Sequence, residues 1–211
     1  MPIPANPALL FGQCAAAHRW VPAAQQFYFL RHGQTARNAL RIFQGPEEPL
    51  DATGQAQAER AGHTLAATGV PITSIAFSDM LRTQQTAEAV SRHLPTATRL
   101  PLPDLRERNF GALIGTSSEQ LAWDCDPVQG ETLAQFVERT AAGLQTALAL
   151  PGPVLVVAHG GTLHALAALL QIKTTAALFA NAHPLQLAPG ADGWTATALA
   201  AAAADQRRDL S

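Results

Sequence analysis

Residues 27–33 have the sequence Phe-Tyr-Phe-Leu-Arg-His-Gly, which passes from an apolar run directly into a charged turn. A short apolar run bounded by a turn is typical of a buried strand. Residues 153–161, Pro-Val-Leu-Val-Val-Ala-His-Gly-Gly, repeat this arrangement later in the chain. Their unbroken apolar pattern predicts a strand that is buried on both faces. We therefore predict two strands that each end at a histidine followed by glycine.

Helical and apolar segments alternate around these two runs. Helices are expected over residues 54–68, 80–93, 131–150 and 162–170, and further strands over residues 72–77 and 98–102. Pro101 places the last of these strands at a sheet edge, and a closing hairpin is expected around Pro189-Gly190. The alternation predicts an α/β fold, a three-layer α/β/α sandwich with a mainly parallel central sheet. Ligands bind such sheets at the carboxyl ends of the strands, where both histidine-glycine turns are expected.

The length of 211 residues suits one domain with a sizeable core. Residues 26–200 carry the pattern of strands and helices and are predicted to form this domain. Residues 1–25 are expected to be a loosely ordered N-terminal extension, and the alanine-rich residues 201–211 a C-terminal tail.

The charge composition argues against nucleic acid or a membrane as the partner. The net charge is −2 and Lys173 is the single lysine, so no broad basic field exists. No apolar run approaches the roughly 18 residues needed to span a bilayer, and no Lys or Arg precedes the apolar residues 7–17 as in an export signal. Cys14 and Cys125 lack metal-ligand spacing and are expected to be free thiols. We therefore predict a cytoplasmic location, without a prediction of the oligomeric state.

Chemistry at phosphorus would suit the first histidine-glycine turn. A neutral imidazole such as that of His32 can attack phosphorus. The guanidinium of Arg31 can hold two phosphoryl oxygens through its fork, and Gly33 permits close backbone approach. Alone, this tripeptide is more often a surface turn, and a lone His159 is more often structural. Two such turns at strand ends favour a shared site.

Further motifs follow in order along the chain. The blocks are residues 29–35 with Asn38, 43–45, 49–50, 53–54, 57–58, 78–87, 105–111, 130–133 and 156–161. Together they resemble the histidine phosphatase superfamily, which includes the cofactor-dependent phosphoglycerate mutases. The resemblance implies the fold of these mutases and a reaction that passes through a phosphohistidine.

The resemblance also implies a role for each matched residue. His32 resembles the phosphorylated histidine, and Glu107 resembles the acid that protonates the leaving oxygen and then activates water. Arg31, Arg82 and His159 resemble the groups that bind the phosphoryl oxygens. The phosphate end of the pocket is further expected to include Asn38, Gln44, Gly45 and Gly160.

Positive charge around the phosphoryl group is expected to take the place of a metal ion. Two guanidiniums and a protonated His159 would face a dianion, and no cluster of His and carboxylates has ligand spacing. We therefore expect no metal and no other cofactor. Each assignment has a structural alternative. Arg82 could be a solvated helix residue, and Glu107 could pair with a neighbouring arginine. His164 could face the pocket mouth or lie on a helix surface.

The segment that follows the glutamate block favours hydrolysis. Residues 109–136 contain no Lys or Arg, although family mutases use such residues to grip the substrate carboxylate. We expect a small acidic lid that admits water, and hence a hydrolase for a small phosphomonoester. Two alternatives stay open. A mutase is favoured by the local sequence of residues 107–113, and a catalytically silent phosphate-binding domain would be expected to lack one of the catalytic residues.

Substrate specificity is expected to lie in residues 109–130 and near Asn181 and His183. A peptide-borne phosphate remains open as a substrate. Because the reaction needs a neutral His32 and a protonated Glu107, we expect a bell-shaped pH profile with its maximum on the acidic side of neutral.

Overall fold

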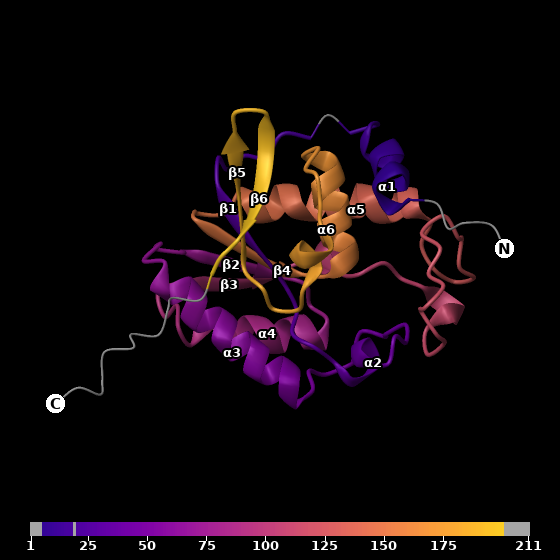
Figure 1. The fold of residues 1–211 in the computed structure, drawn as a ribbon, viewed down its shortest axis with the longest axis horizontal. Coiled ribbons are helices and arrows are strands. Elements are labelled where there is room, and N and C mark those ends of the chain that lie inside the picture. The colour runs from indigo at the N-terminus through magenta and orange to yellow at the C-terminus, as the bar shows by residue number, and fades with distance from the viewer. Residues whose placement is uncertain (1–5, 19, 201–211) are drawn as a thin grey trace.

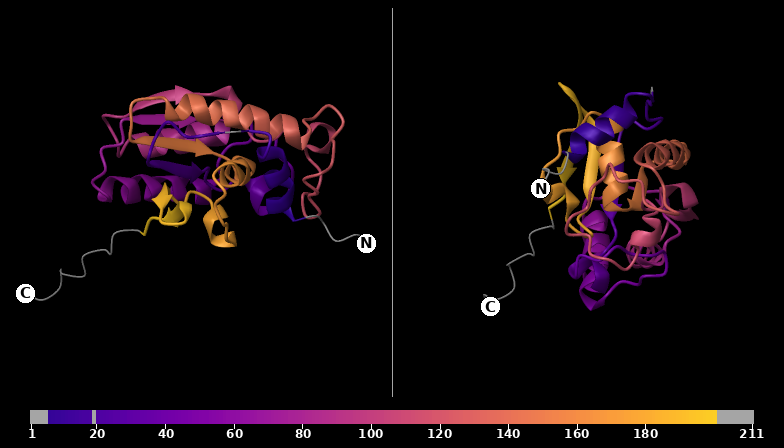
Figure 2. Two further views of the ribbon diagram at one scale, coloured as in Figure 1. Left: turned by 90° about the horizontal axis from the view of Figure 1, so that it is seen from above. Right: turned by 90° about the vertical axis from the view of Figure 1, so that its right-hand side faces the viewer.

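The computed structural model describes residues 6–18 and 20–200. Their strands form one six-stranded sheet between two helical layers (Figures 1 and 2). The strands are β1 (Phe27–Arg31), β2 (Ser74–Phe77), β3 (Thr98–Pro101), β4 (Val154–Ala158), β5 (Leu185–Gly190) and β6 (Gly193–Ala198). The α-helices are α1 (Pro7–Ala15), α2 (Ala36–Ala39), α3 (Ala52–Ala67), α4 (Leu81–Ser91), α5 (Leu133–Leu148) and α6 (Gly160–Leu169). The predicted three-layer sandwich is confirmed.

The order of the sheet is β3-β2-β4-β1-β5-β6. The first four strands are parallel neighbours, and β5 and β6 form the expected hairpin, which pairs antiparallel with β1. The strand β3 lies at an edge, as Pro101 predicts, and all of its residues are exposed. The sheet is therefore mainly parallel, and its two central strands are those that end at the histidine-glycine turns.

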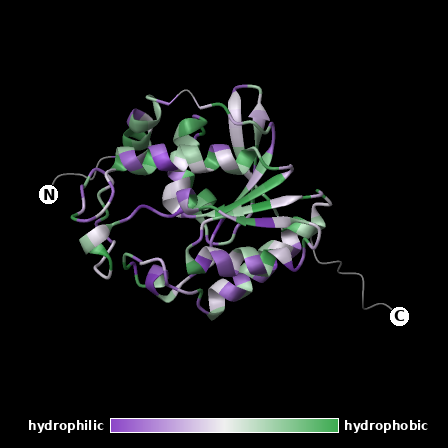
Figure 3. Cartoon of the chain, turned by 180° about the vertical axis from the view of Figure 1, so that it is seen from behind, coloured by the Kyte–Doolittle hydropathy of each residue, from purple (hydrophilic) through white to green (hydrophobic). Residues whose placement is uncertain are grey.

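Alternate residues of the central strands face the two helical layers. Phe27 and Phe29 pack into one core with residues of α5 and α6, while Tyr28 and Leu30 pack into a second core with residues of α3 and α4. Every residue of β4 is buried, which matches its unbroken apolar sequence. Figure 3 shows the same contrast, with hydrophobic strands inside and more hydrophilic helix faces outside. Burial on both faces holds the ends of β1 and β4 in fixed register.

Helix α1 lies within the segment that was expected to be a loosely ordered extension. Its N-terminus is capped by Asn6, whose side chain accepts a hydrogen bond from the Ala8 amide at 3.0 Å. Phe11 has an exposed fraction of 0%, and the helix packs on α5 and α6. A short helix of this kind is stabilised mainly by tertiary packing, which local sequence does not reveal. Residues 7–15 therefore differ from the expectation, and the predicted tail at 201–211 lies outside the described residues.

Within residues 6–18 and 20–200, no helix is both long and apolar enough to cross a membrane.

Candidate active site

The two histidine-glycine turns meet at the carboxyl end of the central strands. In the parallel register Arg31 is opposite Ala158, and the His32 amide donates to the Ala158 carbonyl at 3.0 Å. The imidazole rings of His32 and His159 consequently lie with their centroids 5.2 Å apart. Residues 127 positions apart in sequence thus share one site because β1 and β4 are neighbours.

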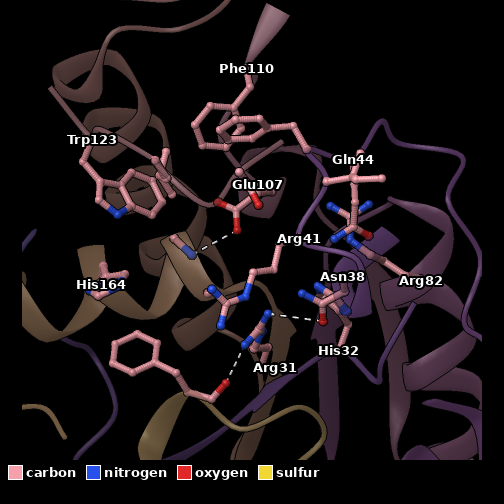
Figure 4. Close-up of a pocket in the computed structure, with 17 residues that line it drawn as sticks. Arg31, His32, Asn38, Arg41, Gln44, Arg82, Glu107, Phe110, Trp123 and His164 are labelled. Carbon is pink, nitrogen blue, oxygen red and sulfur yellow. Dashed lines mark hydrogen bonds between the residues drawn. The ribbon is translucent and has the colours of Figure 1, made fainter. Parts of the chain in front are cut away.

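A pocket of about 340 Å³ opens over this edge of the sheet (Figure 4). Seven of the nine residues expected from the sequence line it: Arg31, His32, Asn38, Gln44, Arg82, Glu107 and Gly160. The other two lie just behind the lining. His159 is completely buried, and the Gly45 carbonyl accepts a hydrogen bond from Arg82 at 2.8 Å. The structure therefore brings together the whole set, which comes from residues 31–45, Arg82, Glu107 and residues 159–160.

His32 is held in one tautomer by its own backbone. Its Nδ1 lies 2.7 Å from the Gly33 carbonyl oxygen, which can only accept, so Nδ1 carries the proton. The lone pair of Nε2 is left free. Burial, and then the nearby Arg82 and Arg31 guanidiniums, hold the pKa of His32 well below its usual range. His32 is thus neutral at neutral pH, which is the state of a nucleophile.

The guanidinium groups of Arg31 and Arg82 are held in place by hydrogen bonds from some of their N–H donors, while other donors remain without a partner. Arg31 donates to the Phe179 carbonyl at 2.5 Å and to Asn38 Oδ1 at 3.4 Å, while Arg82 donates to Gly45. The Nε atoms of both arginines are buried without a partner. Burial lowers the pKa of Arg82 to about 10, so it stays charged at neutral pH. Charged, buried donors without a partner are suited to bind an anion.

The protonation of His159 differs from the expected imidazolium. Its Nε2 lies 2.8 Å from Ser78 Oγ, and its Nδ1 is buried with no partner. Burial, followed by the charge of Arg82, holds the pKa of His159 well below its usual range. His159 is therefore neutral in the free protein, and the two arginines supply the fixed positive charge beneath the pocket.

Glu107 is held by backbone amides rather than by an arginine side chain. Its Oε1 accepts from the Arg108 amide at 2.9 Å and its Oε2 from the Gly161 amide at 3.0 Å. Arg106 pairs instead with Asp79 through two contacts of 2.6 Å. The Arg108 guanidinium donates to backbone carbonyl groups. The alternative of a structural ion pair is therefore not realised, and the Glu107 carboxyl group lines the pocket.

The pocket also contains residues that the sequence analysis did not assign. Arg41 lines it from a turn with φ of 52°, which is uncommon for a residue with a side chain, and Figure 4 shows its side chain directed into the pocket. His164 lines the pocket rather than lying on a helix surface. The ring of Phe179, 4.2 Å from that of His164 between centroids, lines the pocket beside it. Arg41 follows the Asn38 motif by three residues, which is the one local signal for it.

The lid segment presents an apolar face to the pocket rather than the expected acidic one. Its lining residues are Phe110, Ser118, Leu121 and Trp123, whereas Asp124 and Asp126 are not among them. Charged residues of a loop turn to solvent because their desolvation is costly, so counting them does not describe the inner face. Of the region near Asn181 and His183 that was expected to contact the substrate, Phe179 lines the pocket, whereas Asn181 and His183 do not. Asn181 instead donates to the His32 carbonyl at 2.9 Å.

Metal ligands do not gather in the described part of the chain. Over residues 6–18 and 20–200, no group of three or more His, Cys, Asp or Glu side chains is arranged to hold a metal ion.

A mainly parallel sheet with two histidines and two arginines at its carboxyl edge defines an α/β protein with a pocket at the strand ends that is suited to an anion. The chain belongs to the histidine phosphatase superfamily (branch 1), whose family model matches residues 27–200. The resemblance drawn from the motifs is therefore confirmed.

Named relatives of this chain carry two kinds of activity in their names. A Proteus mirabilis protein named probable phosphoglycerate mutase GpmB is 36% identical over 155 residues, 64% of this chain and 69% of that protein. Its counterpart of the same name from Erwinia tasmaniensis is 33% identical over 174 residues, 74% and 77% of the two chains. The solved structure of a mycobacterial glucosyl-3-phosphoglycerate phosphatase in complex with VO3 is 25% identical. It covers 86% of this chain and 100% of that one, with a TM-score of 0.67.

Proposed function

We propose that the protein is a phosphomonoesterase that transfers the phosphoryl group of a small ester to Nε2 of His32 and then to water. One observation carries this proposal. A neutral imidazole, with its proton held on Nδ1 by the Gly33 carbonyl, lies beside two buried guanidiniums whose Nε donors have no partner. Such a site offers a nucleophile and a preformed set of donors for the phosphoryl oxygens.

The first step forms the bond between phosphorus and His32 Nε2 and breaks the ester bond. Arg31 and Arg82 bind the phosphoryl oxygens and stabilise the charge that they carry in the transition state. Glu107, at the pocket wall, donates its proton to the leaving oxygen and becomes a carboxylate. The alcohol then leaves.

The second step breaks the bond between phosphorus and Nε2. The Glu107 carboxylate takes a proton from a water molecule, whose oxygen attacks phosphorus, and inorganic phosphate is released. His32 returns to its neutral form. His159 supports the phosphoryl site from below, with Nδ1 as the group that lacks a partner in the free protein. The expectation that no metal ion takes part remains a prediction, tested below with a chelator.

Hydrolysis is favoured over transfer to a second phosphoglycerate by the inner face of the lid. The residues of this segment that line the pocket carry no positive charge to grip a carboxylate. The phosphatase activity in the name of the mycobacterial structure supports the same choice. The mutase alternative rests on the names of the curated relatives and on Arg41. Arg41 lines the pocket outside the lid segment, and its guanidinium could bind the carboxylate of a phosphoglycerate. A silent phosphate-binding domain is disfavoured because no proposed catalytic residue is missing.

The test is hydrolysis of p-nitrophenyl phosphate in the presence of a chelator. His32→Ala is expected to lower the rate by more than about 10³-fold, since the nucleophile is lost. His93→Ala, at a histidine of α4's C-terminal end that does not line the pocket, is the matched control and keeps the rate. Rapid quenching in base should trap a phosphorylated wild-type protein. A wild-type enzyme without turnover, but active as a phosphoglycerate mutase, would overturn the proposal in favour of the alternative.

A further inference from the structure

One side of the pocket is an aromatic wall, defined here as Phe43, Phe110, Trp123, His164 and Phe179. The rings contact one another in sequence around the pocket. Their centroids are separated by 4.5 Å (Phe43–Phe110), 5.9 Å (Phe110–Trp123), 5.6 Å (Trp123–His164) and 4.2 Å (His164–Phe179). Figure 4 shows the labelled members of the wall on the side of the pocket away from Asn38 and Arg82. The pocket is therefore divided into a charged end and an aromatic side.

The wall lies on the leaving-group side of the pocket. A Cβ atom on Gly161 would be 3.0 Å from both Glu107 Cδ and Trp123 Cη2, so the carboxyl group and the indole ring are immediate neighbours. In the proposed reaction Glu107 protonates the leaving oxygen. The rest of the leaving group is bonded to that oxygen and must therefore lie close to Trp123.

Few groups on this side could pair with a polar leaving group. Outside the phosphoryl end, the side chains in the lining that carry polar groups are Arg41, Ser118, His164 and Trp123, the last through its indole N–H alone. Burial, followed by the Arg31 charge, lowers the pKa of His164 to about 4, so at neutral pH it is an uncharged ring that contacts Phe179 at a tilt of 31°. A leaving group with several hydroxyls would leave most of them unpaired, whereas an apolar ring would gain from leaving water.

The wall is supported from behind by α1, which precedes the segment matched by the family model. Phe11 is completely buried and does not line the pocket. Its ring contacts Trp123 edge-on at 4.9 Å and stacks on His164 at 5.2 Å. Without Phe11, both rings would lose the surface against which they are packed. A helix outside the matched segment thus sets the position of two rings that face the substrate.

We propose that the site selects phosphomonoesters whose leaving group carries an apolar ring, and that Phe11 is a positioning residue for this selection. This inference rests on the proposed phosphatase activity and adds the substrate class to it. The ring of the leaving group lies against Trp123 and Phe179 while its oxygen is protonated by Glu107.

Two matched esters test the selection. 2-Phenylethyl phosphate and 2-hydroxyethyl phosphate are both esters of primary alcohols, so they differ in the group offered to the wall rather than in the ester bond. For the full chain, we expect kcat/KM to be at least about tenfold higher for the phenylethyl ester. The selectivity is the ratio of the two values.

Variants of the wall and of its support are expected to change this ratio. Phe179→Ala and Phe11→Ala should each lower it by about 2- to 10-fold, the contribution expected of one aromatic contact. Loss of folded protein would lower both rates equally and leave the ratio unchanged, so the ratio separates positioning from stability. Leu9→Ala, at an exposed position of α1, is the control for Phe11, and Phe77→Ala, in the second core, is the control for Phe179.

The outcomes separate this inference from the function on which it rests. His32-dependent hydrolysis of both esters with a ratio near or below one would overturn the selection and leave the phosphatase intact. A high ratio that Phe11→Ala does not lower would overturn the role of α1. Hydrolysis of p-nitrophenyl phosphate without hydrolysis of either ester would overturn the selection alone, and no hydrolysis of any of the three would overturn the phosphatase proposal as well.

Discussion

Replacing Gly161 by alanine perturbs the proposed acid without altering a catalytic side chain. Gly161 lies in the first turn of α6, and its amide donates to Glu107 Oε2 at 3.0 Å. The added Cβ would overlap Glu107 Oε1 and lie 3.0 Å from Glu107 Cδ and from Trp123 Cη2. Ordinary contacts between carbon atoms are about 3.5–4.0 Å, so the carboxyl group must move. Trp123 Cη2, which is equally close to the new Cβ, blocks one direction, so the carboxyl group is displaced from the leaving oxygen.

The size of the effect follows from this displacement. A shift of about 1 Å in a catalytic group can cost about 10²-fold in rate. We expect this loss in kcat/KM for 2-phenylethyl phosphate, whose alkoxide must be protonated as it leaves. For p-nitrophenyl phosphate we expect a loss of only a few-fold, because p-nitrophenolate leaves without a proton. Since kcat/KM reports the steps up to formation of the phosphohistidine, the later role of Glu107 with water does not enter.

The assay compares kcat/KM of the two esters for wild type, Gly161→Ala and Gly12→Ala. Gly12 is the matched control, because a Cβ there would meet nothing within 4 Å. An equal loss on both esters would refute the reasoning, since it would mean that the added methyl group damages the phosphoryl site rather than the acid. An unchanged enzyme would show that Glu107 does not act from its observed position.

Three further predictions concern stability and pH. Phe11→Ala should lower the free energy of unfolding by about 3–5 kcal/mol in urea titrations, as for other buried phenylalanines. Leu9 is 60% exposed, so Leu9→Ala should change this free energy by no more than about 0.5 kcal/mol. Equal effects of the two substitutions would show that α1 is not docked. Because the pKa of His164 is lowered to about 4 in the folded state, its contribution to stability is present above the unfolded value near 6.5 and is lost as the pH falls. Between pH 7 and pH 5 the free energy of unfolding of the wild type should therefore fall by about 2 kcal/mol more than that of His164→Phe. Parallel curves of unfolding free energy against pH would contradict the lowered pKa of His164. The lowered pKa of His32 likewise predicts that the acid limb of kcat/KM lies below pH 6.5, and a limb above that value would contradict a neutral nucleophile.

Local sequence was enough to predict the layers of the fold and the residues of the charged end of the site. The apolar runs before His32 and His159 specify strands buried on both faces, because only a central position satisfies such a pattern. Parallel strands with crossover helices place their carboxyl ends together, so both turns were expected at one edge. The resemblance to the family then assigned roles to Arg31, Arg82 and Glu107, since each lies within a block that matches its motifs.

Three features were decided only by tertiary structure. The neutral state of His159 depends on its complete burial and on the charge of Arg82, which is remote in sequence. The apolar inner face of the lid depends on which way the loop turns, because Asp124 and Asp126 are exposed while Trp123 lines the pocket. The docking of α1 depends on Phe11 meeting Trp123 and His164, residues more than 100 positions away. Each of these features depends on packing or on electrostatic interaction between segments that are distant in sequence. Composition and periodicity report only the local conformational preferences of residues that are close along the chain.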